Sequence, residues 1–205
     1  MKLVIQIPCY NEEQSLPVTL RDLPRHIDGI DEIEILVIDD GSTDKTVEVA
    51  SELGVDEVIS LGANKGLAKA FVAGINKALD MGADIIVNTD ADNQYDASYI
   101  KDIVKPLLEN KADIVIGARP VSDIKHFSRL KKILQKLGSF VMRCVSKTDV
   151  KDAPSGFRAF SRNAALQLNV FDNYTYTLET IIQAKAKGLV IESVEVGVNP
   201  ELRKS

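Results

Sequence analysis

The chain has 205 residues, of which 45% are hydrophobic and 27% charged, and its formal net charge is -5 at pH 7. This composition predicts one soluble globular domain and excludes a disordered or collagen-like chain. Two cysteines cannot by themselves make a disulfide framework or a tetrahedral zinc site, and two histidines leave little room for histidine-based metal or triad chemistry. The acidic balance argues against nucleic-acid binding, and the apolar runs are too short for a signal peptide or a membrane span. We therefore expect a cytoplasmic protein.

Short apolar runs alternate with amphipathic helical patterns in the first 117 residues. Runs that are apolar on both faces predict the strands of a parallel sheet, and they occupy residues 3–7, 33–38, 58–59, 85–87 and 114–116. Helices are expected after Ser15, with a proline in the first turn, and after the capping signal at residues 42–44. Further helical stripes cover residues 67–79 and 100–108. This repetition predicts an α/β fold with a doubly wound sheet covered by helices.

The second part of the chain has a different character. Residues 119–147 carry eight basic side chains and one acidic side chain, and an apolar stripe at helical spacing runs from Leu130 to Val145. This segment is either a basic amphipathic helix on an anionic membrane surface or an ordinary helix with solvated lysines. Beyond it we expect a strand over 157–160, a helix over 176–186, and an edge strand that contains Val194, Val196 and Val198.

Polar side chains follow three of the predicted strands, over residues 8–13, 39–42 and 88–94. Ligands bind beyond the carboxyl ends of the strands in such sheets, so these three segments predict one binding site. Helix capping is the alternative explanation for residues 39–44. The chain has neither a Gly-x-x-x-x-Gly-Lys loop nor a Gly-x-Gly-x-x-Gly turn after the first strand, which disfavours P-loop NTPases and dinucleotide oxidoreductases.

Asp90 and Asp92 stand two residues apart at the end of a predicted strand. On an extended backbone the two carboxylates point the same way and can bind one hard cation, with Gln94 as a neutral oxygen ligand. Mg²⁺ or Mn²⁺ held in this way keeps open positions that diphosphate oxygens fill. The alternative is an Asx turn that closes the strand, with Asn93 and Asp96 capping the next helix.

Together these motifs resemble glycosyltransferase family 2. The residues that carry the resemblance are 7–13 (IPCYNEE), 37–44 (VIDDGSTD), 64–66 (NKG), 90–92 (DAD) and 155–158 (SGFR). Within the family, residues 92–94, 117–119 and 152–158 are most similar to dolichol-phosphate mannose synthases and bacterial polyprenyl-phosphate glycosyltransferases. The resemblance implies one GT-A domain over residues 1–205, Rossmann-like, with a mostly parallel central sheet flanked by helices.

The resemblance also implies roles for particular residues. Residues 1–117 are expected to bind the nucleotide-sugar, a UDP- or GDP-sugar, and 118–205 the acceptor. Nucleotide-sugar contacts are expected from Pro8, Tyr10, Glu12, Asp39, Asp40, Asp90 and Ala91, and metal ligands from Asp90, Asp92 and Gln94. Contacts to the acceptor or the diphosphate are expected from Arg119, Arg129, Ser155 and Arg158, whose guanidinium groups suit phosphate oxygens. Asp152 is the candidate catalytic residue, which would orient the acceptor or act as a base.

The expected reaction is an inverting, metal-dependent transfer of a sugar from a nucleotide-sugar to polyprenyl phosphate, with peripheral contact at the inner face of the cell membrane. A phosphate acceptor is already an anion and needs no general base. The family's usual pair of acids is absent, since Thr180 follows Glu179, and this favours a phosphate acceptor. A glycan or lipid-linked saccharide acceptor in cell-envelope polysaccharide synthesis is the alternative. A nucleotidyltransferase and a non-catalytic nucleotide-sugar-binding module are alternatives from other classes.

Overall fold

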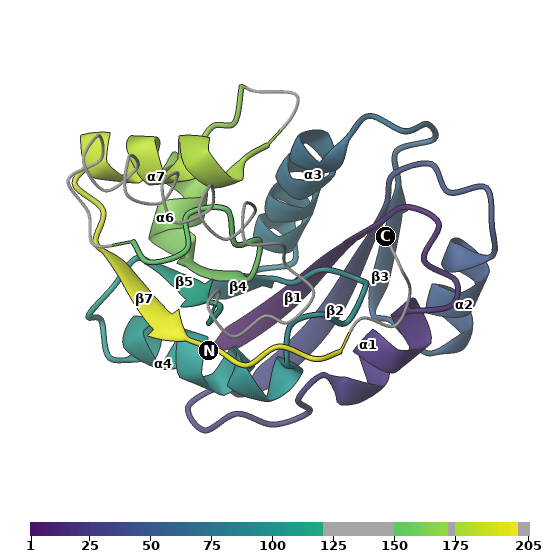
Figure 1. Ribbon diagram of the computed structural model, residues 1–205, viewed down its shortest axis with the longest axis horizontal. Helices are drawn as coiled ribbons and strands as arrows, with labels where there is room; N and C mark the ends of the chain where they lie inside the picture. Colours follow the sequence, from purple (N-terminus) through teal and green to yellow (C-terminus); the bar gives the residue numbers. More distant parts are fainter. Residues whose placement is uncertain (121–149, 172–174, 201–205) are drawn as a thin grey trace.

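A computed structural model of the protein describes residues 1–120, 150–171 and 175–200 (Figure 1). Its centre is a seven-stranded sheet with the strand order β3-β2-β1-β4-β6-β5-β7. The strands are β1 (Lys2–Cys9), β2 (Glu32–Asp39), β3 (Glu57–Ser60), β4 (Ile85–Asn88), β5 (Ile114–Ala118), β6 (Arg158–Ser161) and β7 (Ile191–Glu195). The helices are α1 (Leu16–Asp22), α2 (Thr46–Glu52), α3 (Leu67–Asp80), the 3-10 helix η1 (Ala97–Tyr99), α4 (Ile100–Leu108), α6 (Arg162–Gln167) and α7 (Thr177–Ala186). The predicted α/β class is confirmed.

Parallel pairing dominates the sheet, and β6 is the exception. It pairs antiparallel with both β4 and β5, while β7 pairs in parallel with β5 at the edge of the sheet. Because β6 runs in the opposite direction, its first residue, Arg158, lies opposite Asn88 at the carboxyl end of β4. The loop that precedes β6 therefore lies at the same edge of the sheet as the acidic residues that follow β4.

Apolar side chains on both faces of the strands divide the interior into two cores. Leu3, Ile5 and Ile7 of β1 pack with residues of α1 and α4, whereas Val4 packs with residues of α3, α6 and α7. Figure 1 shows these two sets of helices on opposite sides of the sheet. Each fully buried apolar side chain contributes about 1.5–3 kcal/mol, so the apolar strands predicted from the sequence stabilise both layers at once.

The starts of the first two helices differ in detail from the predicted caps. Ser15 stands before α1, but its backbone is already helical and its hydroxyl donates to the Glu12 carboxylate instead of capping the helix. The helix α2 begins at Thr46, and the Asp44 carboxylate accepts a hydrogen bond from its backbone N–H at 3.0 Å. Asp44 therefore supplies the capping contact expected from residues 42–44.

The last strand also differs from its prediction. The valine alternation indicated an edge strand over 194–198, but β7 ends at Glu195. Beyond it Val198 bridges Tyr95, and the backbone N–H of Asn199 donates to the Gln94 carbonyl at 2.8 Å. The chain leaves the sheet there because it pairs with the loop that follows the acidic motif.

Within the described ranges, no helix is long and apolar enough to cross a membrane.

Candidate active site

A pocket of about 220 Å³ opens at the carboxyl ends of β1 and β2. Its lining joins the loop after β1, the end of β2 and the first turn of α3, and consists of Pro8, Cys9, Tyr10, Asp40, Asn64, Gly66, Leu67 and Ala70. The Tyr10 side chain is 44% exposed, so its ring is available to a planar ligand. The structure thus brings together Pro8, Tyr10 and Asp40, which were predicted to contact the nucleotide.

Asp40 fixes the wall of this pocket. Its carboxylate accepts hydrogen bonds from the backbone N–H groups of Lys65 at 2.7 Å and Gly66 at 2.8 Å. Next to it, Gly41 has a φ of 78°, and a Cβ there would lie 2.5 Å from the backbone carbon of Ala63. The backbone at Ala63 therefore approaches so closely that position 41 requires glycine. This contact holds the loop before α3 against the end of β2.

Asp39 and Glu12 have other surroundings. Asp39 is buried and accepts from the Ser42 N–H at 2.8 Å and the Ser60 hydroxyl at 2.7 Å. Burial opposes the charge of Asp39, but the hydrogen bonds outweigh it and lower the pKa of this carboxyl. Asp39 therefore closes the turn after β2 and does not line the pocket. The half-buried Glu12 carboxylate accepts from Ser15.

The acidic motif follows β4 at the same edge of the sheet. Burial, together with the charges of Asp92 and Glu12, raises the pKa of the half-buried Asp90 to about 7, although the charge of Arg119 acts to lower it. Charged side chains from three segments of the chain thus act on Asp90. The Ala91 side chain is buried, and its carbonyl accepts from Thr19 at 2.8 Å.

The Asx turn, which the sequence predicted as the alternative to a metal site, is present after β4. The Asp92 carboxylate accepts from the Gln94 backbone N–H at 3.0 Å, and Asp96 caps the next helix through the Ser98 N–H at 2.9 Å. The turn is therefore present in the structure, whereas the assignment of Asp90, Asp92 and Gln94 as metal ligands stays a prediction. Among the described residues, no group of three or more histidine, cysteine, aspartate and glutamate side chains is placed to hold a metal.

Arg119 and Asp152 form an ion pair beside the acidic motif. Arg119 Nε donates to Asp152 Oδ2 at 2.7 Å and Nη2 donates to Oδ1 at 3.2 Å, and the guanidinium carbon lies 5.5 Å from the Tyr95 ring centroid. Asp152 is only 1% exposed. Both oxygens of this buried carboxylate accept from the Arg119 guanidinium, so Asp152 orients Arg119. The catalytic role of Asp152 stays a prediction.

Two residues predicted to touch the acceptor or the diphosphate lie inside the protein. Arg158 is fully buried and donates to four protein oxygens, those of Ala153, Ser155, Thr177 and the Thr180 hydroxyl. Ser155 is also fully buried, and its hydroxyl bonds to Tyr95. The structure therefore assigns Arg158 and Ser155 to the support of the loop before β6. Arg129, the third predicted arginine, lies outside the described residues, as does the basic segment around it.

The sequence reasoning missed Asn88, Tyr95 and Tyr176, which surround the loop before β6. Tyr95 OH accepts from the Gly156 N–H at 3.1 Å, and the Asn88 amide donates to the Gly156 carbonyl at 2.9 Å. Asn88 and Tyr95 flank the acidic motif in the sequence, which is a signal that could have marked them. Tyr176 lies far along the chain and carried no comparable signal.

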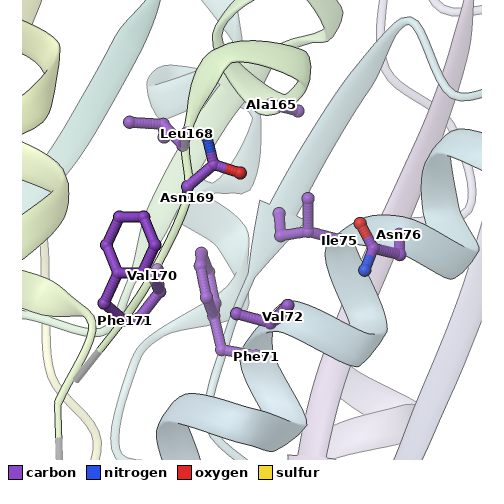
Figure 2. Close-up of a pocket in the computed structure, with 9 residues that line it drawn as sticks. All are labelled: Phe71, Val72, Ile75, Asn76, Ala165, Leu168, Asn169, Val170 and Phe171. Carbon is purple, nitrogen blue, oxygen red and sulfur yellow. The ribbon is translucent and has the colours of Figure 1, made fainter. Parts of the chain in front are cut away.

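A second pocket, of about 170 Å³, lies between α3 and the segment after α6. Figure 2 shows Phe71, Ile75, Leu168, Val170 and Phe171 around it. The ring of Phe71 stacks on Tyr176 with centroids 3.7 Å apart. This apolar pocket was not predicted, because its walls come from segments that are distant in the sequence.

The fold has a GT-A-like architecture, as a comparison with a solved structure shows. The crystal structure of glucosyl-3-phosphoglycerate synthase from Mycobacterium tuberculosis, in complex with Mn²⁺, UDP-glucose and phosphoglyceric acid, matches with a TM-score of 0.79 at 22% identity. The match covers 100% of this chain and 72% of that chain. Residues 4–168 match glycosyl transferase family 2, and the chain belongs to this family.

Relatives with assigned activities agree with the family. UDP-N-acetylglucosamine--dolichyl-phosphate N-acetylglucosaminyltransferase of Methanococcus voltae is 32% identical, over 93% of this chain and 82% of the relative. Undecaprenyl-phosphate mannosyltransferase of Micrococcus luteus is 28% identical, over 97% of this chain and 83% of the relative. The protein is a glycosyltransferase, which sets aside the nucleotidyltransferase and the non-catalytic binding module.

Proposed function

We propose that this enzyme transfers a sugar from a nucleoside diphosphate donor to a polyprenyl phosphate, with inversion at the anomeric carbon. The observation that carries the proposal is the pocket at Tyr10 and Asp40, which shares one edge of the sheet with Asp90, Asp92 and Arg119. The named activities of the archaeal and bacterial relatives, on dolichyl phosphate and undecaprenyl phosphate, support the acceptor. In this proposal residues 1–117 bind the donor and residues 118–205 bind the acceptor.

The nucleoside occupies the pocket between the loop after β1 and the first turn of α3. Tyr10 offers its exposed ring to the base, because an aromatic face stacks on any planar heterocycle. Asp40 holds the backbone of Lys65 and Gly66, so the wall that meets the nucleoside is already formed before the donor binds. Preorganisation of this kind lowers the entropic cost of binding.

The residues of the acidic motif fit a divalent cation. Asp90 and Asp92 repel each other in partly desolvated surroundings, and this contributes to the raised pKa of Asp90. Asp90, Asp92 and the amide oxygen of Gln94 are hard oxygen ligands of the kind that Mg²⁺ and Mn²⁺ prefer. A cation bound there would stabilise the negative charge of the departing nucleoside diphosphate. The structurally similar synthase was solved with Mn²⁺ and UDP-glucose.

Arg119 is the proposed contact for the acceptor phosphate or the donor diphosphate. Asp152 holds its guanidinium in one orientation through two hydrogen bonds, and Tyr95 lies under it. A fixed cation offsets the repulsion between an anionic nucleophile and an anionic donor. The phosphate oxygen attacks the anomeric carbon in line with the departing diphosphate, so no side chain has to remove a proton.

The test combines donor selection with a transfer assay. Thermal shift with UDP- and GDP-sugars and Mn²⁺ selects the donor, since a ligand at 100 times its Kd adds about 2.7 kcal/mol of stability. The labelled sugar is then offered with undecaprenyl phosphate, dolichyl phosphate or soluble saccharides, and NMR of the product gives the anomeric configuration. We expect transfer to a polyprenyl phosphate that EDTA abolishes and that Asp92→Asn lowers at least about 100-fold, equivalent to roughly 2.7 kcal/mol.

The possible results separate the proposal from its alternative. Efficient transfer to a saccharide with none to polyprenyl phosphate would replace the proposed acceptor with a glycan or a lipid-linked saccharide. Undiminished transfer in excess EDTA, or full activity of Asp92→Asn, would contradict the proposed metal.

A further inference from the structure

The Gly156 peptide is held from both sides. Its N–H donates to Tyr95 OH at 3.1 Å, and its carbonyl accepts from the Asn88 amide at 2.9 Å and from Tyr176 OH at 3.2 Å. The Asn88 amide also donates to Tyr176 OH at 2.9 Å and accepts at its oxygen from Gln6 at 2.8 Å. Groups from β4, from the residue before α7 and from the loop after the acidic motif therefore hold the backbone of Gly156 on both sides, and Gln6 of β1 holds Asn88 in turn.

Glycine at this position is not required by the backbone. Gly156 does not have a left-handed φ, so the backbone conformation at this position would not strain an alanine. The neighbours impose the requirement instead. A Cβ at position 156 would lie 3.2 and 3.3 Å from the two carboxylate oxygens of Asp90, and 3.3 Å from Tyr176 OH. These separations are shorter than the ordinary van der Waals contacts of 3.4–4 Å, so the neighbours would have to give way by a few tenths of an ångström.

Asp90 is the neighbour that can move. Tyr176 is fully buried, its ring is stacked on Phe71 at an interplanar angle of 2°, and its hydroxyl takes part in hydrogen bonds to Asn88 and Gly156. Asp90 is only half-buried. An added methyl group at position 156 would therefore displace the carboxylate and leave the tyrosine in place.

We propose that Gly156 is a positioning residue: its backbone, held by Tyr95 and Asn88 and carrying no side chain, positions the Asp90 carboxylate for the divalent cation. The inference rests on the proposed function, where Asp90 is one of the groups that hold Mg²⁺ or Mn²⁺. It adds that the loop before β6, which contributes none of the metal ligands in that proposal, determines how well the acidic motif holds the cation.

The test measures binding of Mn²⁺ by electron paramagnetic resonance, in the presence of whichever of UDP and GDP stabilises the wild-type protein. Gly156→Ala is expected to raise the Mn²⁺ concentration for half-saturation at least fivefold. Tyr176→Phe keeps the stacked ring, and the Gly156 carbonyl keeps its bond from Asn88, so this variant should change half-saturation less than twofold.

The double variant distinguishes positioning from general damage to the fold. Removal of the Tyr176 hydroxyl opens space on one side of the alanine methyl group, so Gly156→Ala with Tyr176→Phe should regain at least half of the lost Mn²⁺ affinity. Gly188→Ala is the matched control, because Gly188 has a left-handed φ of 72° with no atom within 4 Å of an added Cβ. It should lower the melting temperature without changing Mn²⁺ binding.

The results distinguish the positioning role of Gly156 from the proposed metal-dependent function. Unchanged Mn²⁺ binding by Gly156→Ala, or a double variant that binds Mn²⁺ more weakly than Gly156→Ala alone, would overturn the positioning role and leave the proposed function standing. Failure of the wild-type protein to bind Mn²⁺ with either nucleotide would overturn the proposed metal-dependent function and this inference with it.

Discussion

Replacement of Asp40 by asparagine tests how the nucleotide pocket is built. The aspartate carboxylate accepts from two consecutive backbone N–H groups, those of Lys65 and Gly66, at 2.7 and 2.8 Å. Asparagine has one acceptor oxygen, so its amide group must face one of these N–H donors. Asp40→Asn therefore removes the negative charge and one of the two acceptors with almost no change in side-chain volume.

The size of the effect follows from these contacts. Hydrogen bonds to a charged group contribute about 1.5–3 kcal/mol each, and a donor left without an acceptor costs about 1–3 kcal/mol. The two N–H groups are partly exposed, so we expect Asp40→Asn to lower the free energy of unfolding by about 2–3 kcal/mol. For a chain of this length that corresponds to a fall in melting temperature of roughly 5–10 °C. The donor Kd should rise at least about tenfold, since the pocket wall is no longer fixed.

Calorimetry and donor titration measure the two effects, and Asp56→Asn is the control. Asp56 accepts from the backbone N–H of Ile35 at 2.8 Å, before β3 and away from the pocket. This control should lose some stability and keep the donor affinity of the wild type. An Asp40→Asn protein with wild-type melting temperature and donor affinity would refute the assignment of Asp40 to the pocket wall.

Three further predictions concern the support of the site. Gly41→Ala should lower the free energy of unfolding, measured in urea, by about 2–4 kcal/mol, because Gly41 has a left-handed φ and lies close to the Ala63 backbone. Gly54→Ala is the control: Gly54 also has a left-handed φ but no atom near an added Cβ, so the loss should be about 1–2 kcal/mol. Arg158→Met leaves four buried oxygens without this donor and should cost about 3–5 kcal/mol of stability, and equal donor affinity in the folded protein would confirm that this arginine is structural. The lowered pKa of Asp39 contributes stability above its unfolded pKa of about 3.9, which is lost as the pH falls through the folded value. The stability difference between the wild type and Asp39→Asn should therefore shrink between pH 5 and pH 2, and a constant difference would contradict this account.

The sequence predicted the fold well where periodicity carried the information. Apolar runs such as residues 33–38 became strands because parallel strands are covered on both faces, and the stripe over 100–108 became α4. The end of β7 was not predictable from its valines. Val198 continues the alternation, but its partner is Tyr95, and pairing between distant segments leaves no periodic signal.

The sequence predicted correctly that some residues after neighbouring strands lie together, and their role in nucleotide binding stays a prediction. Tyr10 follows β1 and Asp40 follows β2, so the parallel register of those strands brings them to one pocket. Asp39 shows the limit of this rule. It differs from Asp40 by one residue, yet its carboxylate turns toward Ser42 and Ser60, because successive side chains at the end of a strand point in opposite directions.

Arg119 and Arg158 show why residue type alone could not assign the acceptor site. Both carry the same guanidinium and both occur in the motifs that resemble the family, but β5 and β6 run in opposite directions. Arg119 follows β5 and lies beside Asp152 near the acidic motif, whereas Arg158 begins β6 and turns inward to four protein oxygens. The direction of one strand thus separates a cation that can serve a phosphate from a cation that holds the loop around Gly156. Because the same antiparallel strand brings that loop to the end of β4, the buried arginine also supports the backbone on which the proposed position of Asp90 depends.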